Sequence, residues 1–207
     1  MAAYITNGNI SAEQGVNLPT QWTLDHEPPK ADLAKLATGE DPNWGRMHIP
    51  IMKRVPMLNH VEYYHRRGGH VLPATHDYWI RLAHRPDSRF LQTSLGFVAD
   101  AGPPLLVESF RPATRDAPIP PGGFAFNKGF WYPTLTMTLD VRRALPDEGL
   151  EWLRLRVAAK EVSNGRYDAE VVMFDEEGNL VALSHHVAMA VDVERNYAKR
   201  DNPKGKI

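Results

Sequence analysis

The 207-residue chain contains no cysteine. Disulfide bonds, a thiol nucleophile and a thiolate-bound metal are therefore excluded. The chain also lacks an excess of charge, because 24 lysines and arginines stand against 25 aspartates and glutamates, for a formal net charge of −1. This balance gives no electrostatic reason to expect a nucleic acid or an anionic membrane as a partner.

A long apolar segment is missing as well. No stretch approaches the roughly 18 uninterrupted apolar residues that span a bilayer. Residues 1–15 have neither the basic start nor the apolar run of a secretory signal. The sequence therefore predicts a cytoplasmic protein with no membrane partner.

Signatures of several enzyme classes are absent. No Gly-x-Ser-x-Gly elbow of a serine hydrolase occurs, and the glycine-rich segment 120–126 lacks the pattern of a phosphate-binding loop. The adjacent His185 and His186 would point to opposite faces of a strand and so cannot chelate one ion. No zinc-ligand spacing occurs among the remaining histidines, so the sequence predicts no metal and no cofactor. Five of them nevertheless lie close in sequence: His60, His65, His70, His76 and His84.

What is present divides the chain into three parts. Residues 1–56 contain six prolines and are predicted to be an irregular N-terminal extension, with one helical turn at 31–37. Trp22 and Trp44 indicate that part of this extension packs on the remainder. Residues 57–193 form the predicted domain, and residues 194–207 form a C-terminal tail.

The domain shows strand-like segments, rich in aromatic and β-branched residues or alternating in polarity. Asn164-Gly165 is a strong signal for a two-residue hairpin turn. In the third strand, alternation predicts one polar face and one apolar face. The polar face comprises Thr134, Thr136, Thr138 and Asp140, and the apolar face Leu135, Met137, Leu139 and Val141. The predicted strands are 60–66, 76–85, 131–141, 151–162, 166–174 and 180–191.

One helix is predicted between the second and third strands, over residues 89–101. Pro86-Asp87-Ser88 is a helix-start signal with Asp87 or Ser88 as the cap, and Pro103-Pro104 is predicted to end the helix. The segment is apolar around most of its circumference, which indicates burial. A single buried helix among antiparallel strands predicts an α+β fold, with a curled antiparallel sheet wrapped around one central helix.

Three segments resemble motifs of the acyl-CoA thioesterase II family. Residues 95–100 (LGFVAD) resemble the central helix, residues 134–139 (TLTMTL) a site strand, and residues 174–186 the final hairpin and strand. The resemblance covers roughly residues 57–193 and follows the second half of this double-hotdog family. It therefore implies the hotdog fold. The segment before residue 57 looks like the connection between the two halves.

The resemblance also implies a catalytic set. In this family an aspartate, a threonine and a glutamine hold a water against a thioester carbonyl; here they correspond to Asp100, Thr134 and His186. His185 takes the last place if the register differs by one residue. His186 shares its predicted strand face with small residues, which favours close approach of another group. The residues expected to contact substrate are Gly96, Phe97 and Trp131.

Plainer roles remain open for the same residues. Asp100 can be a solvated residue at a helix end, Thr134 ordinary strand surface, and His186 a partner in a buried hydrogen bond. The aromatic residues within 124–132 can pack the core or line an acyl pocket.

The expected function is hydrolysis of an acyl-CoA or a carrier-bound acyl thioester. Family sites lie between two hotdog modules and the first half has no counterpart here, so a second copy or another hotdog chain is the expected partner. The first alternative is a biosynthetic enzyme that performs cyclisation, dehydration or isomerisation on a polyketide- or terpenoid-like substrate. The second is a non-catalytic binding subunit.

Overall fold

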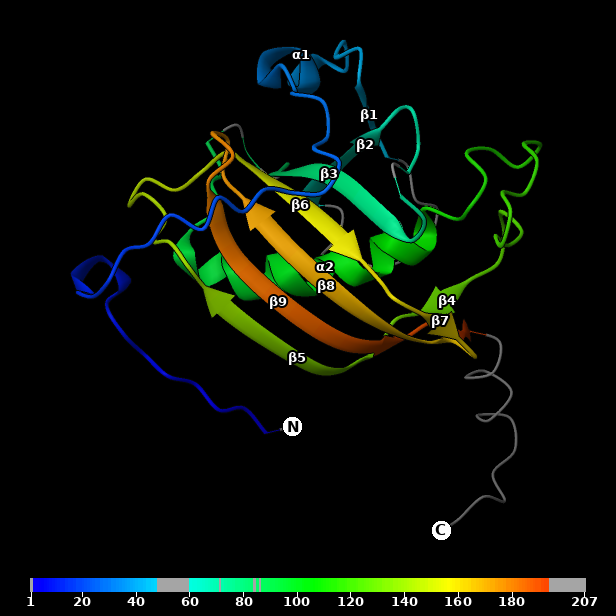
Figure 1. The fold of residues 1–207 in the computed structure, drawn as a ribbon. Coiled ribbons are helices and arrows are strands. Elements are labelled where there is room, and N and C mark those ends of the chain that lie inside the picture. The colour runs from blue at the N-terminus through cyan, green and yellow to red at the C-terminus, as the bar shows by residue number, and fades with distance from the viewer. Residues whose placement is uncertain (1, 48–59, 71, 84, 86, 194–207) are drawn as a thin grey trace.

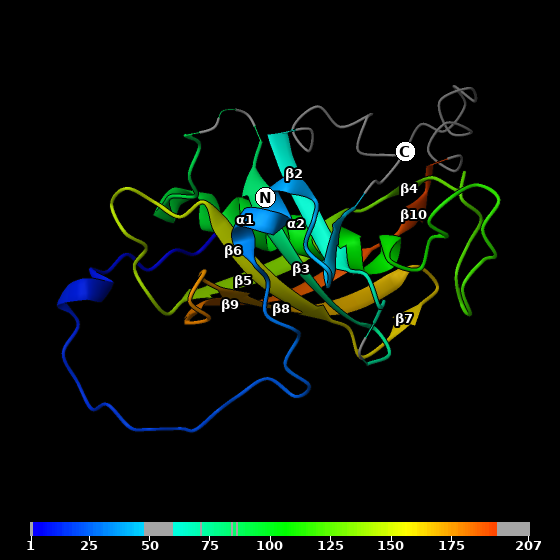
Figure 2. The same ribbon diagram turned by 90° about the horizontal axis from the view of Figure 1, so that it is seen from above.

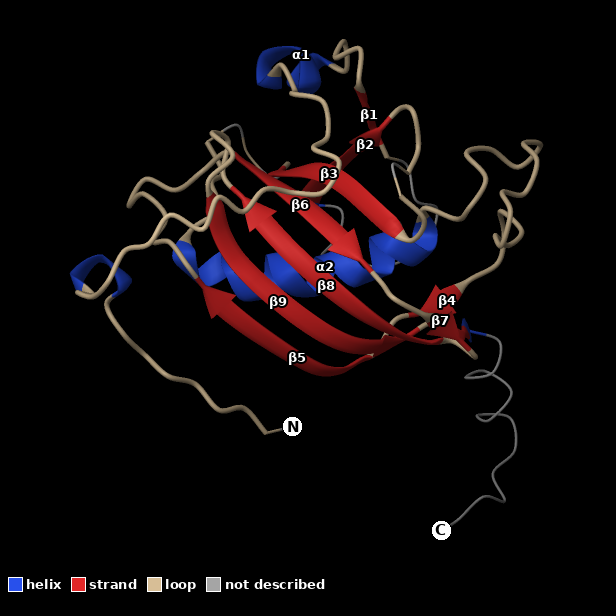
Figure 3. Ribbon diagram, viewed as in Figure 1, coloured by secondary structure: helices blue, strands red, loops and turns tan. Residues whose placement is uncertain are grey.

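A computed structural model describes residues 2–47, 60–70, 72–83, 85 and 87–193. A curved antiparallel sheet dominates this part of the chain, and one long helix lies across one of its faces (Figure 1; Figure 3). The predicted α+β architecture, a curled sheet around one central helix, is confirmed. His84, Pro86 and the predicted tail 194–207 lie outside the described residues.

The main sheet follows the order β1-β2-β3-β6-β8-β9-β5, with β7 added beside β8. All of these pairings are antiparallel. A second, two-stranded sheet joins β4 to β10. The strands are β1 (Trp44–Arg46), β2 (Val61–Arg66), β3 (Thr75–Leu82), β4 (Phe130–Trp131), β5 (Thr134–Val141), β6 (Trp152–Ala158), β7 (Val162–Ser163), β8 (Arg166–Phe174), β9 (Leu180–Met189) and β10 (Val191–Asp192).

The hairpin between β7 and β8 forms as predicted. Asn164 and Gly165 both adopt positive φ angles, of 51° and 79°. A two-residue turn with two positive φ angles matches the right-handed twist of its strands, and asparagine and glycine tolerate this conformation best. The register of β8 against its neighbours is thereby fixed close to the turn.

The central helix differs from its predicted limits at both ends. α2 spans Leu95–Glu108 and follows a 3₁₀ turn, η4 (Gln92–Ser94). The predicted start was wrong because Phe90 forms a bridge with Leu150 instead of entering the helix. The predicted end was wrong because α2 continues through Pro103 and Pro104.

Burial explains why the helix tolerates two prolines. A proline inside a helix removes a hydrogen bond and costs about 3 kcal/mol. The residues that follow, Leu105, Leu106 and Val107, are all buried in the main core beneath the sheet. Burying each such side chain contributes about 1.5–3 kcal/mol, so one further buried turn offsets the proline cost.

Within residues 2–47, the described part of the N-terminal extension, there are two shorter helices: η1 (Ile10–Ala12) and α1 (Leu33–Thr38). α1 is the helical turn predicted at 31–37. Asp32 caps it by accepting a hydrogen bond from the Lys35 N–H at 3.2 Å. None of the helices in the described segments is long and apolar enough to cross a lipid bilayer.

The later part of the extension packs on the face of the sheet opposite to α2, whereas its first residues run away from the sheet and are exposed (Figure 1; Figure 2). Leu36 and Trp44 form a buried cluster with three aromatic residues of the sheet, Tyr64, Trp79 and Trp152. Trp22 stacks on Phe174 with ring centroids 6.4 Å apart. Both tryptophans of the extension therefore contact the sheet, and β1 adds a strand that the sequence pattern did not predict.

A buried arginine fastens the extension to the centre of the sheet. Arg156 on β6 donates to both carboxylate oxygens of Asp77, each at 2.8 Å. Its remaining N–H groups donate to the backbone carbonyls of Asp25 and His26. The planar guanidinium thus satisfies a carboxylate on one side and a chain segment on the other.

Candidate active site

Asp100 and Thr134 meet where the central helix passes the edge strand of the sheet. The Thr134 hydroxyl donates a hydrogen bond to Asp100 Oδ1 at 2.6 Å. Both side chains are exposed. Asp100 lies in the middle of α2 and is not a frayed helix end. The helix and strand together present a carboxylate and a hydroxyl to an open surface.

A β-bulge turns Thr134 toward the helix. Thr134 pairs with Ala188 on β9, whereas Thr136 pairs with Val187, so β5 contains one extra residue between them. Ala188 belongs to the buried core beneath α2. Cross-strand partners share a face of the sheet, so Thr134 faces the helix and Thr136 faces away. The prediction that Thr134, Thr136, Thr138 and Asp140 share one face was wrong, because the bulge shifts the alternation by one residue.

His186 lies on the same inner face of β9. It is only 3% exposed, whereas His185 is exposed. Small inner residues surround it along the strand, including Ala182 and Ser184. Ser184 Oγ lies 2.9 Å from His186 Nε2 and also donates to the Thr138 carbonyl at 2.5 Å. His186, rather than its neighbour, is therefore the histidine directed toward the helix.

Electrostatics connects His186 and Tyr167 to Asp100. Burial lowers the pKa of His186, and the Asp100 carboxylate opposes this by favouring the charged ring. Tyr167 on β8 is buried, and its hydroxyl has no hydrogen-bond partner in the described part of the chain. Burial raises the pKa of Tyr167 and the Asp100 charge raises it further, so the phenol stays protonated. Tyr167 was not predicted as a site residue, because only the β8–β9 register brings it to this face.

The three predicted substrate-contacting residues lie around this position without converging on one point. Gly96 is one helical turn before Asp100, with open space where a Cβ atom would be. Phe97 packs partly against the core. Trp131 is 57% exposed on β4. Gly96 and Trp131 are thus accessible to a ligand, whereas Phe97 contributes to packing.

Comparison with known proteins decides the family. Residues 25–190 match the family model described as the acyl-CoA thioesterase C-terminal domain. The chain belongs to this thioesterase family. The matched range contains the central helix, the bulged strand and the last long strand, and so includes Asp100, Thr134 and His186.

Two relatives support the family and the fold. The chain is 32% identical over 218 residues to the thioesterase-like protein TwmA of Talaromyces wortmannii, a match that covers 96% of this chain and 62% of TwmA. The chain thus spans less than two thirds of that relative's length. The fold of the present chain is similar to that of a hot dog fold protein from Alicyclobacillus acidocaldarius, with a TM-score of 0.56 and 16% identity. This match covers 86% of the present chain and 58% of the other protein. The implied hotdog fold is confirmed.

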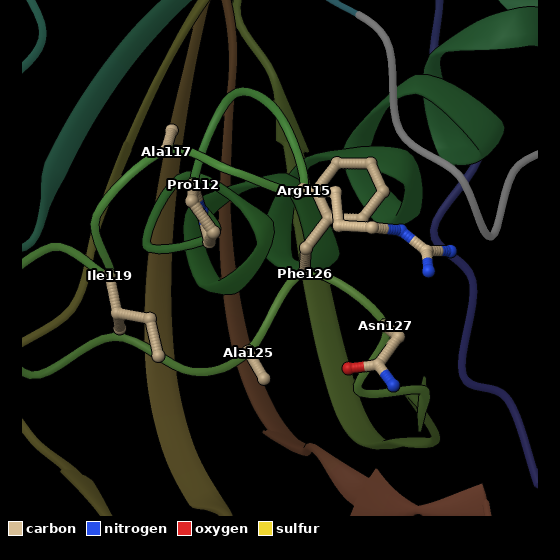
Figure 4. A pocket seen from close by; sticks show the side chains of 7 residues that line it. All are labelled: Pro112, Arg115, Ala117, Ile119, Ala125, Phe126 and Asn127. Atoms are coloured by element: carbon tan, nitrogen blue, oxygen red, sulfur yellow. The ribbon is translucent and has the colours of Figure 1, made fainter.

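The loop between α2 and β4 contains a cavity of about 200 Å³, lined by residues that include Ile119, Ala125 and Phe126 (Figure 4). None of the three predicted catalytic residues lines it. Arg111 organises this loop by donating to the backbone carbonyls of Phe126 and Lys128, at 2.6 and 2.7 Å. This thioesterase-family chain therefore has a surface cavity that the Asp100–Thr134 pair does not line.

Aromatic residues of the same loop divide between the two roles considered from the sequence. Phe124 and Tyr132 pack against the main core, and Tyr132 donates to the buried Glu108. Phe126 instead lines the loop cavity. Phe124 and Tyr132 thus take the packing role, whereas Phe126 lines a cavity.

Three of the clustered histidines come together behind the C-terminal end of α2. The ring centroid of His76 lies 6.2 Å from that of His65 and 5.1 Å from that of His70. Burial lowers the pKa of His76 to about 3, with further lowering from His70 and His65. Among the described residues, no three His, Asp or Glu side chains are arranged to hold a metal ion. The buried ring of His76 is therefore favoured in its neutral form, packed beside His65 and His70.

Proposed function

We propose that the chain hydrolyses an acyl-CoA or carrier-bound acyl thioester, with a water held by Asp100, Thr134 and His186. The observation that supports this most directly is the 2.6 Å hydrogen bond from Thr134 to Asp100 on an exposed surface of a thioesterase-family fold. The inward-facing His186 lies close enough for the Asp100 charge to act on its ring.

The arrangement suits activation of a water molecule. Because the Thr134 hydroxyl donates to Asp100, its oxygen lone pairs can accept a hydrogen bond from water. The water oxygen bonds to the thioester carbonyl carbon while its proton passes to Asp100 or His186. The tetrahedral intermediate then collapses, the C–S bond breaks, and the proton passes to the thiolate. The products are a carboxylic acid and a free thiol.

A second copy of the chain is the proposed partner. β5 is the edge of the main sheet and leaves a row of backbone N–H and C=O groups available for pairing. Leu135 and Met137 on this strand are 48% and 41% exposed. A second hotdog module beside β5 would cover this apolar surface and enclose the Asp100–Thr134 pair, which stands open in the single chain.

Steady-state hydrolysis of a panel of acyl-CoAs tests the proposal. We expect turnover by the wild-type chain and a loss of kcat of about 100-fold or more in Asp100→Asn, because the carboxylate and its Thr134 contact are removed. Thr134→Val should also lower kcat. Absence of turnover by a folded wild-type chain on every acyl-CoA would rule out hydrolysis of these substrates.

The same strand provides a matched control. Thr136 is exposed like Thr134 but faces away from the helix because of the bulge. Thr136→Val should therefore leave kcat within a factor of about two, since surface substitutions away from special contacts have small effects. Equal losses of kcat in Thr134→Val and Thr136→Val would show that replacing a threonine on β5 lowers kcat regardless of the hydrogen bond to Asp100.

A second candidate is a non-hydrolytic biosynthetic step such as dehydration or isomerisation. A titratable base, His186, stands where the family resemblance implies an amide, and a buried base can move a proton on a bound substrate. Proton exchange into a bound polyketide-like ligand without thioester cleavage would favour this candidate.

A further inference from the structure

The hydroxyl of Ser184 has two polar neighbours that constrain where its hydrogen lies. Ser184 Oγ is 2.5 Å from the carbonyl oxygen of Thr138 and 2.9 Å from Nε2 of His186. A serine hydroxyl has one hydrogen to donate, and a carbonyl oxygen can only accept. The hydrogen therefore points to Thr138. Ser184 must then accept from His186, which requires a hydrogen on Nε2.

The opposite assignment is unfavourable. If Ser184 donated to Nε2, its oxygen and the Thr138 carbonyl oxygen would face each other at 2.5 Å with no hydrogen between them. Ser184 is 1% exposed and His186 3% exposed, so bulk solvent screens little of that repulsion between the two oxygens. Polar conflicts cost more in a buried environment than at the surface.

A neutral imidazole with its hydrogen on Nε2 has its free lone pair on Nδ1. His186 Nδ1 is buried and has no hydrogen-bond partner among the residues that the structure describes. We propose that Ser184 is a positioning residue that fixes the Nε2–H tautomer of His186, and that His186 Nδ1 is the atom that accepts the proton from the attacking water. This inference rests on the proposed hydrolase function and names the base within that site.

The surroundings of the ring suit this role. Asp100 on α2 favours the protonated ring electrostatically, so it stabilises the imidazolium that forms when Nδ1 takes the proton. Nε2–H continues to donate to Ser184 throughout, which keeps the ring in place. When the C–S bond breaks, Nδ1–H returns the proton to the thiolate. The neutral Tyr167 hydroxyl on the same inner face adds a hydrogen-bond donor.

Nitrogen NMR of the full, uniformly labelled chain tests the tautomer directly. The signals of His186 are identified by their loss in His186→Gln. In the neutral wild-type protein we expect a pyrrole-type signal for Nε2 and a pyridine-type signal for Nδ1. A pyrrole-type Nδ1 in the wild-type chain would overturn the proposal, and this readout depends on no enzyme activity; the variant serves only to assign the signals, so its other histidine signals must match those of the wild type.

Two substitutions of Ser184 separate positioning from packing. Ser184→Ala removes the acceptor, so the His186 signals should average between tautomers and kcat should fall about 10- to 100-fold with KM nearly unchanged. Ser184→Thr retains the hydroxyl and should restore both the tautomer and most of kcat. An unchanged tautomer and unchanged kcat in a folded Ser184→Ala would contradict the proposal.

Failure of the inference and failure of the proposed function are distinguishable. The Nε2–H tautomer in a chain that hydrolyses no thioester would support the Ser184–His186 assignment while removing its catalytic use. Hydrolysis by a chain with an Nδ1–H tautomer would support the function and exclude Nδ1 as the base.

Discussion

His186 is a buried residue that can change charge. Two titratable groups act on its ring: Asp100 from α2 and His185 from its own strand. Burial and His185 lower its pKa, and Asp100 opposes them. A base must be neutral to accept a proton, so in the proposed mechanism the position of this pKa sets the rate in weak acid.

A pH profile of His186→Gln tests this control. In the wild-type chain kcat/KM should fall as the pH drops through the lowered pKa of His186, because the protonated ring cannot accept a proton. Glutamine does not titrate, so that part of the acid limb should disappear, and the rate at pH 8 should fall about 10- to 100-fold. An unchanged acid limb in the variant would assign the limb to another group.

His76 controls stability rather than chemistry. Its pKa in the folded chain is about 3, below the value of 6.5 for a free histidine. Between these values the unfolded chain binds more protons than the native chain, so stability is lost as the pH falls below about 6.5. The full slope is about 1.4 kcal/mol per pH unit.

Urea unfolding of His76→Phe at several pH values between 6.5 and 4.5 should therefore show a flatter dependence than the wild type. Phenylalanine can occupy the site because His76 Nε2 makes no hydrogen bond to any described residue. His26→Asn is the matched control, since the His26 side chain is 55% exposed, and its positive φ of 56° suits asparagine. Parallel curves for His76→Phe and the wild type would refute the role of His76.

At the scale of one element, α2 contains two glycines in contrasting environments. A Cβ atom on Gly102 would lie 2.8 Å from the Tyr78 hydroxyl and 3.1 Å from a Val157 methyl group. A Cβ atom on Gly96 would meet nothing within 4 Å. The helix thus approaches the sheet most closely at Gly102, toward its C-terminal half.

The two alanine substitutions should have opposite effects. Gly102→Ala should destabilise by about 1–3 kcal/mol through overpacking, whereas Gly96→Ala should stabilise by about 0.5–1 kcal/mol because alanine is the better helix former. Thermal or urea unfolding measures both. Destabilisation by Gly96→Ala would contradict the packing described here.

Elements repeating a pattern over many residues were predicted best from the sequence. β8 begins and ends where alternation and the Asn164-Gly165 turn place it. The limits of α2 were missed, because tertiary burial of Leu105 to Val107 outweighs the local preference of proline to end a helix. β1 was missed because three residues are too short for a pattern.

The site residues also differ in how far the sequence alone could predict them. The inward direction of His186 follows from the small residues on its face of β9 and was visible in the sequence. The direction of Thr134 depends on the bulge in β5. Strict alternation wrongly placed it on the same face as Thr136, Thr138 and Asp140. The bond from Ser184 to the Thr138 carbonyl was not predictable, because it joins two strands whose register only the structure gives. The catalytic roles themselves stay a prediction.

At the scale of the whole molecule, the exposed edge at β5 predicts dimerisation. Met137 pairs with His186 across the strands and is 41% exposed, so it lies on the helix-facing side of that edge. A charge there would be buried and unpaired in the proposed interface. Met137→Glu should therefore shift the mass measured by sedimentation from dimer to monomer and lower kcat.

Val162→Glu is the matched control for this prediction. Val162 is 48% exposed on β7, which pairs with β8 away from the β5 edge. The same charge at this position should leave the dimer intact. A wild-type chain that is monomeric at all concentrations, or dissociation by both variants, would contradict an interface at β5.

The hydrogen bonds from Arg156 to the N-terminal extension constrain the order in which parts of the chain fold during synthesis. His26 and Arg156 are 130 positions apart in sequence. A ribosome adds about 5–20 residues per second, so on the order of ten seconds separates the appearance of the two partners. His26 therefore leaves the ribosome well before Arg156, and the extension can make this contact only after β6 has been made. The backbone carbonyl of His26 thus waits for its arginine partner while the intervening chain is synthesised.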